Sequence, residues 1–133
     1  MQPNDDEFIY KASDVLVQSS WELPIVIQWP QSKVTYEFTS TPGDISFGIV
    51  FVPAPDEPRD PDDLEIETVE EISRVSSHNE IIGGEFEAPC EGVVFFLWDN
   101  NFDWSAVKKI SYSINVVQVR FVFSFICIYK VNN

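Results

Sequence analysis

Residues 33–52, KVTYEFTSTPGDISFGIVFV, decide the fold class of this chain. Apolar and polar side chains alternate along residues 33–39, and they alternate again along residues 44–52. A period of two is typical of strands that have one face against a core and the other in water. The segment Thr41–Asp44 between the runs contains Pro and Gly, which are common in turns. The stretch therefore predicts two half-buried strands separated by a turn.

The rest of the chain extends this pattern. Further strands are expected at residues 23–28, 79–87, 92–98 and 109–116. The two continuously apolar runs, residues 23–28 and 92–98, are typical of central strands of a sandwich, and the pair Gly83–Gly84 suggests a bulge. Residues 68–75 are compatible with one turn of helix, but no helix of ten residues is indicated. About seven or eight short strands predict an all-β fold, an antiparallel β-sandwich.

The phase of the alternation predicts the core between the two sheets. The expected core residues are Tyr36, Phe38, Ile45, Phe47, Ile49, Phe95, Leu97, Tyr112 and Ile114. Each lies on the side of its strand that we expect to face inward.

Length, composition and charge restrict the function. With 133 residues, 44% of them hydrophobic, the chain has material for one domain with a real core. Eight basic and 22 acidic residues give a net charge of −14. This charge argues against binding of nucleic acid, whose phosphates need a cationic surface, and against direct attachment to anionic lipid. Any membrane association is therefore expected to be indirect.

The termini and the cysteines favour a cytoplasmic protein. Residues 1–7 are polar and acidic, unlike a secretory signal. The apolar run at residues 116–131 is interrupted by polar residues and is short for a membrane-spanning helix. We expect Cys90 and Cys127 to be reduced thiols.

The segment Pro53–Glu71 differs in composition from its surroundings. It contains four prolines and nine acidic residues against one Arg. One interpretation is a solvated loop that keeps the domain soluble, and the other is a docking site for a basic protein partner. Candidate partner contacts in this segment are Asp56, Asp60, Asp62 and Asp63.

No residue pattern predicts catalysis or a bound cofactor. The single His, His78, lies in a polar turn and is interpreted as a solvated residue. The sequence contains no nucleophile elbow, no phosphate-binding glycine loop and no His-Glu-x-x-His motif. Two cysteines and one His do not suffice for a structural zinc site. We therefore expect no catalytic, cofactor-binding or metal-binding residues.

A calcium site is the alternative that the acidic segments leave open. Loops at one end of a β-sandwich can pool Asp and Asn oxygens around a hard cation. The candidate ligands are Asp99, Asn100, Asn101 and Asp103, joined by Asp56, Asp60, Asp62 and Asp63 if the two segments meet in space. The simpler interpretation is that Asp99 and Asn100 shape a turn, with side chains bonded to nearby backbone amides.

Three aromatic residues, Trp98, Phe102 and Trp104, surround that turn. In one interpretation Trp98 ends a core strand and the other two cover the end of the sandwich. In the other, Phe102 or Trp104 is an exposed contact for a protein partner, because aromatic residues are enriched in binding hot spots.

Four short motifs follow one another along the chain. They are VTYEF at residues 34–38, DISFGI at 44–49, the region 77–92 with Gly83–Gly84 and Gly92, and WDNNFDW at 98–104 followed by KKISYSI at 108–114. Together they resemble the GOLD (Golgi dynamics) domain family, and the resemblance covers about Ala12–Val119. It implies a β-sandwich of jelly-roll type that serves protein–protein interaction and is not an enzyme.

The resemblance also implies a setting for the domain. GOLD domains occur in transmembrane cargo receptors of the early secretory pathway, in Golgi adaptors with an acyl-CoA-binding domain, in an autophagy adaptor with FYVE and coiled-coil regions, and in CRAL-TRIO lipid-transfer proteins. It thus implies a module of membrane trafficking, of Golgi or vesicle dynamics, or of lipid-transport adaptor complexes, at the cytosolic face of Golgi or vesicle membranes. A calcium- or lipid-binding β-sandwich module is the alternative.

The chain divides into three expected parts. Residues 12–119 form the GOLD-like β-sandwich, residues 1–11 a polar N-terminal extension, and residues 120–133 a hydrophobic tail. The tail is apolar on both faces, so it extends the last strand, pairs with a partner, or begins a membrane-associated segment. We expect partner contact at a sheet edge, with the acidic segment steering the encounter.

Overall fold

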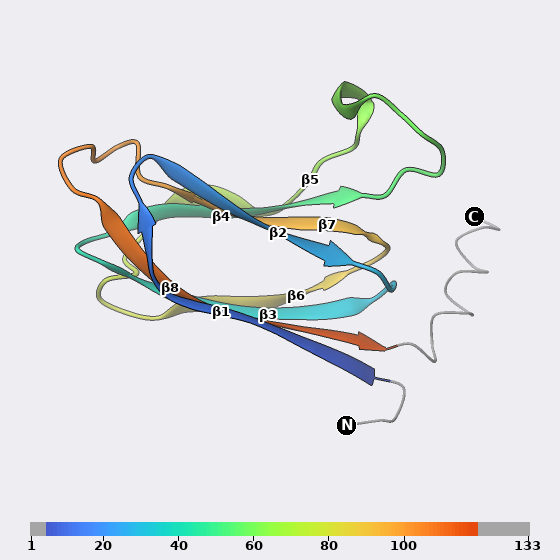
Figure 1. The fold of residues 1–133 in the computed structure, drawn as a ribbon, viewed down its shortest axis with the longest axis horizontal. Helices are drawn as coiled ribbons and strands as arrows, with labels where there is room; N and C mark the ends of the chain where they lie inside the picture. Colours follow the sequence, from blue (N-terminus) through green and yellow to red (C-terminus); the bar gives the residue numbers. More distant parts are fainter. Residues whose placement is uncertain (1–4, 120–133) are drawn as a thin grey trace.

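The computed structural model describes residues 5–119, which form a sandwich of two antiparallel sheets (Figure 1). The strands are β1 (Asp5–Val17), β2 (Ser20–Ile27), β3 (Ser32–Thr41), β4 (Ile45–Pro53), β5 (Glu67–Val75), β6 (Ile82–Ala88), β7 (Gly92–Asp99) and β8 (Lys108–Val119). A single 3₁₀ turn, η1 (Pro61–Asp63), interrupts the connection between β4 and β5. Among residues 5–119, no helix is long and apolar enough to cross a membrane.

The strand order is that of a jelly roll. Sheet A has the order β1-β8-β3-β6, and sheet B has the order β2-β7-β4-β5. The chain is thus wound so that β1 pairs with β8, β2 with β7, β3 with β6 and β4 with β5, each pair antiparallel. The predicted antiparallel sandwich of jelly-roll type with about seven or eight strands is confirmed.

Aromatic side chains fill the centre of the core. Phe38 of sheet A packs against both Phe47 and Trp98 of sheet B, with ring centroids 4.5 and 5.6 Å away. Five of the nine expected core residues are buried, namely Phe38, Ile45, Phe47, Ile49 and Ile114. Tyr36 and Tyr112 are partly buried and pack against the same cluster.

The expected phase of β7 was wrong by one residue. Val94, Phe96 and Trp98 face the core, so Phe95 and Leu97 lie on the opposite, outer side of sheet B. The reason is that β7 reads GVVFFLWD and is apolar on both faces, so alternation carries no information about its phase. The continuously apolar β2 also differs from expectation, because it is an edge strand of sheet B and not a central one.

Three local predictions are corrected by the backbone. Residues 68–75 belong to β5 and not to a helical turn, because Val69 and Val75 pack against the core along β4. The pairing of β3 with β6 passes through Gly83–Gly84 without a register shift, so there is no bulge. These glycines instead permit close approach: a Cβ on Gly83 would lie 2.6 Å from the Tyr36 carbonyl oxygen. Strand β1 begins at Asp5, within the segment expected to be an extension.

The two outer faces of the sandwich differ in polarity. On sheet A, the outward positions of β3 and β6 are Lys33, Thr35, Glu37, Glu85 and Glu87, all of them exposed. On sheet B, cross-strand rows place apolar side chains side by side. They are Val26–Val93–Val52 and Pro24–Phe95–Val50, from β2, β7 and β4. Sheet B therefore presents an apolar surface away from the core.

Candidate functional site

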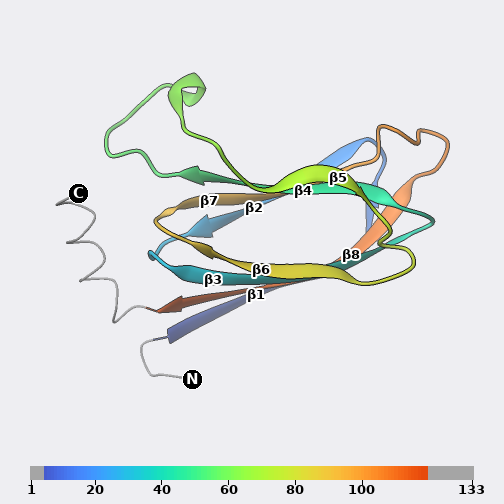
Figure 2. The same ribbon diagram turned by 180° about the vertical axis from the view of Figure 1, so that it is seen from behind.

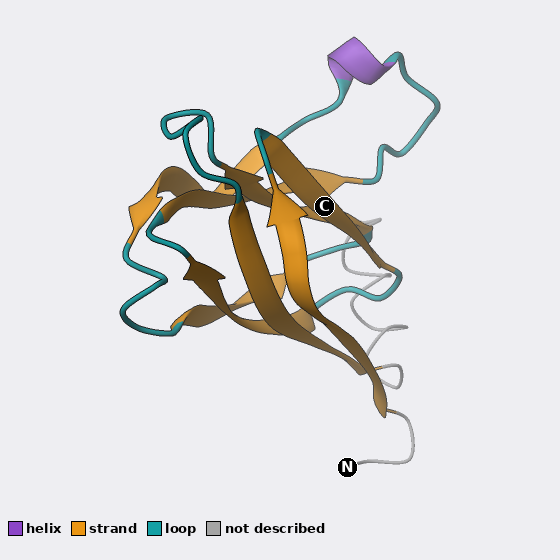
Figure 3. Cartoon of the chain, turned by 60° about the vertical axis from the view of Figure 1, so that its left-hand side comes forward, coloured by secondary structure: helices purple, strands orange, loops and turns teal. Residues whose placement is uncertain are grey.

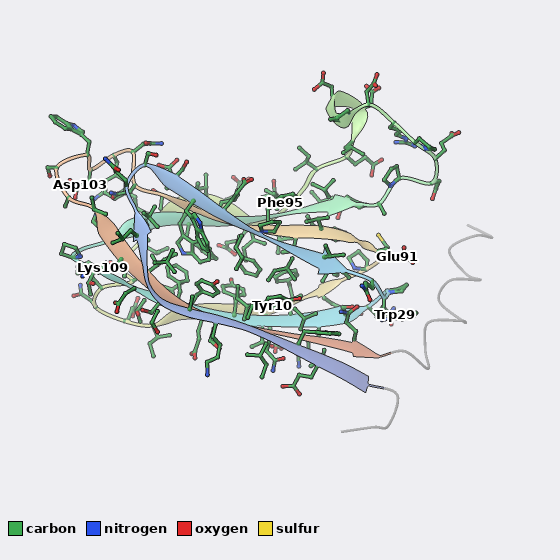
Figure 4. The ribbon with its side chains drawn as sticks, viewed as in Figure 1. Tyr10, Trp29, Glu91, Phe95, Asp103 and Lys109 are labelled. Carbon is green, nitrogen blue, oxygen red and sulfur yellow. The ribbon has the colours of Figure 1, made fainter. Side chains whose placement is uncertain are left out.

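The two groups of candidate contact residues lie at opposite ends of the sandwich. Strand β7 runs from Gly92, opposite Pro53 at the start of the acidic connection, to Asp99 at the other end. The acidic loop (residues 54–66) and the tryptophan loop (residues 100–107) are therefore separated by the length of the strands (Figures 1 and 2). The labelled side chains in Figure 4 show the same arrangement, with Glu91 and Trp29 at one end and Asp103 and Lys109 at the other.

This separation corrects the idea of a pooled calcium site. The carboxylates of the acidic loop cannot join those of the tryptophan loop, because the β-sandwich lies between them. Among residues 5–119, no three His, Cys, Asp or Glu side chains are grouped so that they could hold a metal ion. His78 is exposed in the turn between β5 and β6, where Ser76 accepts backbone hydrogen bonds.

Asn100 fastens the tryptophan loop to the body of the domain. Its side chain is fully buried, and its Nδ2 donates to the carbonyl oxygens of Ala106 at 2.7 Å and Gln18 at 3.2 Å. Its backbone N–H donates to the Ser19 carbonyl at 2.7 Å. Asn100 thus ties the loop to the β1–β2 turn through backbone carbonyls, whereas the sequence predicted bonds to backbone amides. Asp99 does accept from a backbone amide, that of Asn101, at 2.8 Å.

A buried lysine completes this arrangement. The side chain of Lys108 is 1% exposed, and its Nζ donates to Asn100 Oδ1 at 2.8 Å and to Asp103 Oδ2 at 3.1 Å. The Ser105 hydroxyl donates to Asp103 Oδ1 at 2.6 Å. Two hydrogen bonds hold the pKa of the Asp103 carboxyl below its ordinary value. The one from Ser105 has the larger effect on this pKa, and the one from Lys108 comes next. The buried cation is therefore neutralised by a carboxylate that stays ionised.

Phe102 lies against two cationic side chains from outside the loop. The Arg74 guanidinium lies 4.0 Å from the centroid of its ring, and the Lys108 ammonium lies 4.9 Å from it. Arg74 is itself held by Asp44, with Nη2 2.8 Å from Oδ2. The ring remains 37% exposed. The role of Phe102 at this end of the sandwich is thus to provide the aromatic face on which two cations lie.

Trp104 does not share this role. It is 91% exposed, the largest exposed fraction among the large hydrophobic residues of the described chain. It lies two residues from the fastened Phe102 and next to Asp103, whose carboxylate is held from both sides. The indole of Trp104 is therefore exposed to solvent, while buried hydrogen bonds restrain the backbone of its loop.

The acidic loop at the other end has a different construction. It stands away from both sheets, with η1 near its outermost point (Figure 3). Asp56, Asp60, Asp62 and Asp63 are all exposed, and η1 contains no buried residue. The loop is joined to the sandwich where the Ala54 N–H donates to the Glu91 carbonyl at 2.9 Å.

A groove lies between this loop and the outer face of sheet B. It is open to solvent, has a volume of about 750 Å³ and has a mostly apolar wall. The lining residues include Val26 and Trp29 from β2 and the turn after it, Val93 from β7, Val52 from β4 and Leu64 from the loop. A second hollow of about 260 Å³ shares Pro53, Pro55 and Leu64 with the groove and continues beneath the loop.

Sequence reasoning missed several of these residues. Lys108 and Arg74 were not among the candidates, because nothing in their spacing marks one as buried and the other as stacked on a ring. The groove was not predicted, because its lining residues come from β2, β4, β7 and the acidic loop, which are distant in sequence. The run GVVFFLWD was the available signal, since a strand that is apolar on both faces has a second surface to cover.

Comparison with known proteins gives two relatives in sequence. The chain is 32% identical over 94 residues to human FYVE and coiled-coil domain-containing protein 1, and 31% identical over 94 residues to the mouse protein of that name. The match covers 71% of this chain but only 6% of either relative, so the chain is similar to a short part of a much longer protein. No protein-family profile matches the chain.

Among solved structures, the similarity concerns the fold alone. A chain in the structure of the infectious bursal disease virus Gx strain superposes with a TM-score of 0.52 at 9% sequence identity. The superposition covers 86% of this chain and 32% of the viral one. At this identity the match says nothing about a shared function.

Proposed function

We propose that the chain is a non-catalytic protein–protein interaction module of the GOLD type that works in membrane trafficking. Its setting would be Golgi or vesicle dynamics or a lipid-transport adaptor complex, at the cytosolic face of the membrane. The similarity to a FYVE and coiled-coil protein supports this proposal, because a protein with those regions is one of the settings that the sequence motifs implied.

One observation carries the interaction role. Trp104 is 91% exposed on a loop that Asn100 and Lys108 fasten from inside. An exposed indole normally lowers solubility, and buried polar groups are costly unless fully hydrogen-bonded. Here an exposed indole stands on a loop that buried, hydrogen-bonded side chains hold in place. A partner can therefore contact this large amphipathic ring at little further cost in conformational entropy.

The proposal is tested by affinity capture with the immobilised full chain. Proteins from a cell extract should be retained by the wild type and lost with Trp104→Ala, and trafficking or adaptor proteins should be among them. Phe8→Ala is the matched control, since Phe8 is an exposed aromatic residue on β1, 40% exposed. If Trp104→Ala retains the same proteins as the wild type, Trp104 is not the contact and the proposed role loses its support.

A further inference from the structure

The groove at the acidic end is apolar at its floor. Val26, Val93 and Val52 form one cross-strand row, and Leu64 faces it from the loop. Val26 remains 59% exposed although it lies in a strand. Such a floor on a small domain is a surface that gains free energy when another apolar surface covers it.

The rim of the groove, which we define as residues 54–67, carries a strong negative charge. It contains seven acidic residues and one Arg, a net charge of 1 − 7 = −6. Glu91, whose carbonyl accepts from the Ala54 N–H at the base of the loop, lines the groove and adds a carboxylate. The ion pairs within the described chain involve Glu85, Asp44 and Asp103, and none of these lies on the rim. The rim therefore attracts cations and repels anionic lipid and nucleic acid.

The open edges of sheet B offer a poorer place for a partner than this face does. Edge strand β2 contains Pro24, which has no N–H to donate to an added strand. The other edge strand, β5, pairs with β4 through two register shifts and exposes several carboxylates. Interrupted and charged edges disfavour strand addition, so contact through the face is the better fit.

We propose that this groove binds a segment of a protein partner in which apolar residues are flanked by Lys or Arg. The apolar side chains cover the row Val26–Val93–Val52 and Leu64, and the basic side chains reach the carboxylates of the rim. The inference rests on the proposed interaction role and adds the site and the chemistry of the partner to it. Charge complementarity selects the occupant, because an acidic or uncharged apolar segment gains nothing from the rim.

The test is a selection of random 12-residue peptides displayed on phage against the immobilised full chain. We expect the enriched peptides to combine an apolar run with Lys or Arg on its flanks. Their binding should weaken at least tenfold with Val26→Lys, which places a cation on the floor, and should weaken as salt is raised. Leu64→Lys, in the exposed loop, is a second variant that does not depend on a strand tolerating the change.

The matched control is Leu16→Lys. Leu16 lies on edge strand β1 of sheet A and is 63% exposed, close to the 59% of Val26, so it changes net charge and exposed apolar area alike. Peptide binding should be unchanged in this variant. Enrichment of acidic peptides, absence of enrichment, or equal binding by the Val26→Lys and Leu64→Lys variants would each overturn the groove proposal.

Two outcomes separate this proposal from the interaction role. Peptides that ignore Val26→Lys but are lost with Trp104→Ala would overturn the groove and leave the role intact. If the full chain sediments as a dimer that Val26→Lys converts to a monomer, the groove is occupied by a second copy and the partner proposal fails.

Discussion

Both ends of the sandwich combine polar or charged side chains with apolar ones, but the two ends turn them in opposite directions. At the tryptophan loop, the polar side chains of Asn100 and Lys108 are turned inward and the apolar Trp104 outward. At the acidic loop, the carboxylates are turned outward and the apolar side chains face a groove. Buried hydrogen bonds fix the first loop, whereas the described residues of the second make few such contacts. The difference teaches that the first end presents a rigid contact, and the second an apolar surface with a charged border.

The largest expected effect is a loss of stability from a change in the tryptophan loop. Asn100→Ala removes the donor to the Gln18 and Ala106 carbonyls and the acceptor for Lys108 Nζ. We expect a loss of about 2–4 kcal/mol in the free energy of unfolding, because unsatisfied buried polar groups cost about 1–3 kcal/mol and more where a charge is involved. Chemical denaturation measures this loss. Asn101→Ala, at an exposed neighbour, should change stability by less than about 0.5 kcal/mol. Equal effects of the two variants would show that the loop is not fastened from inside.

The fold itself could be predicted from the sequence because most strands alternate cleanly. Val34–Phe38 and the run from Ile45 place one apolar face toward the core, and water on the other face fixes their phase. Alternation does not fix the phase of β7, because both of its faces are apolar and the phase depends on which surface the neighbouring strands cover. Alternation is also weak in β5, which is mostly polar and forms a strand by pairing with β4.

The candidate site could be predicted only in part. The acidic loop and the pair Phe102–Trp104 could be named as candidate contacts, since charge and aromatic content are visible in composition. Which of the two aromatic residues is the more exposed was not visible, because the answer depends on Arg74, a residue distant in sequence that stacks on Phe102. The relation of the two loops was also hidden, since the strands between them decide whether the loops share an end.

Acidification should remove the stability that the Asp103 carboxylate contributes at the tryptophan loop. The pKa of Asp103 is lowered in the folded state by Ser105 and Lys108, so as the pH falls the unfolded chain binds this proton first. The stability contributed by the carboxylate is complete above the ordinary Asp pKa of about 3.9 and is lost as the pH falls through the lower folded value. Melting temperatures of the wild type and Asp103→Asn, compared between about pH 6 and pH 2.5, should therefore converge at the acid end. A constant difference across this range would contradict the ion pair as its cause.

A smaller effect is expected from the ring of Phe102 at the same end. Phe102→Leu keeps an apolar side chain but removes the face on which Arg74 and Lys108 lie, and we expect a loss of about 1 kcal/mol. Trp104→Leu should change stability by less than about 0.5 kcal/mol, because the indole is already in solvent. Thermal denaturation of both variants measures the contrast. If Trp104→Leu were the more damaging change, the division of roles between the two aromatic residues would be wrong.

The acidic end should show almost no effect on stability and a clear effect on association. Charge reversal of Asp60, Asp62 and Asp63 to Lys leaves the fold intact, because these side chains are exposed and η1 buries nothing. For a peptide obtained by the selection above, association should become slower and less sensitive to salt, while dissociation changes little, since exposed charges at a rim act mainly on the encounter. Stopped-flow mixing at several salt concentrations separates the two rates. Reversal of Glu37, Glu80 and Glu87, exposed residues outside the rim, alters net charge equally and is the control. If the rim steers a partner, the variant with the rim reversed slows association more than the control variant does. Equal slowing by the two variants would show that only net charge matters.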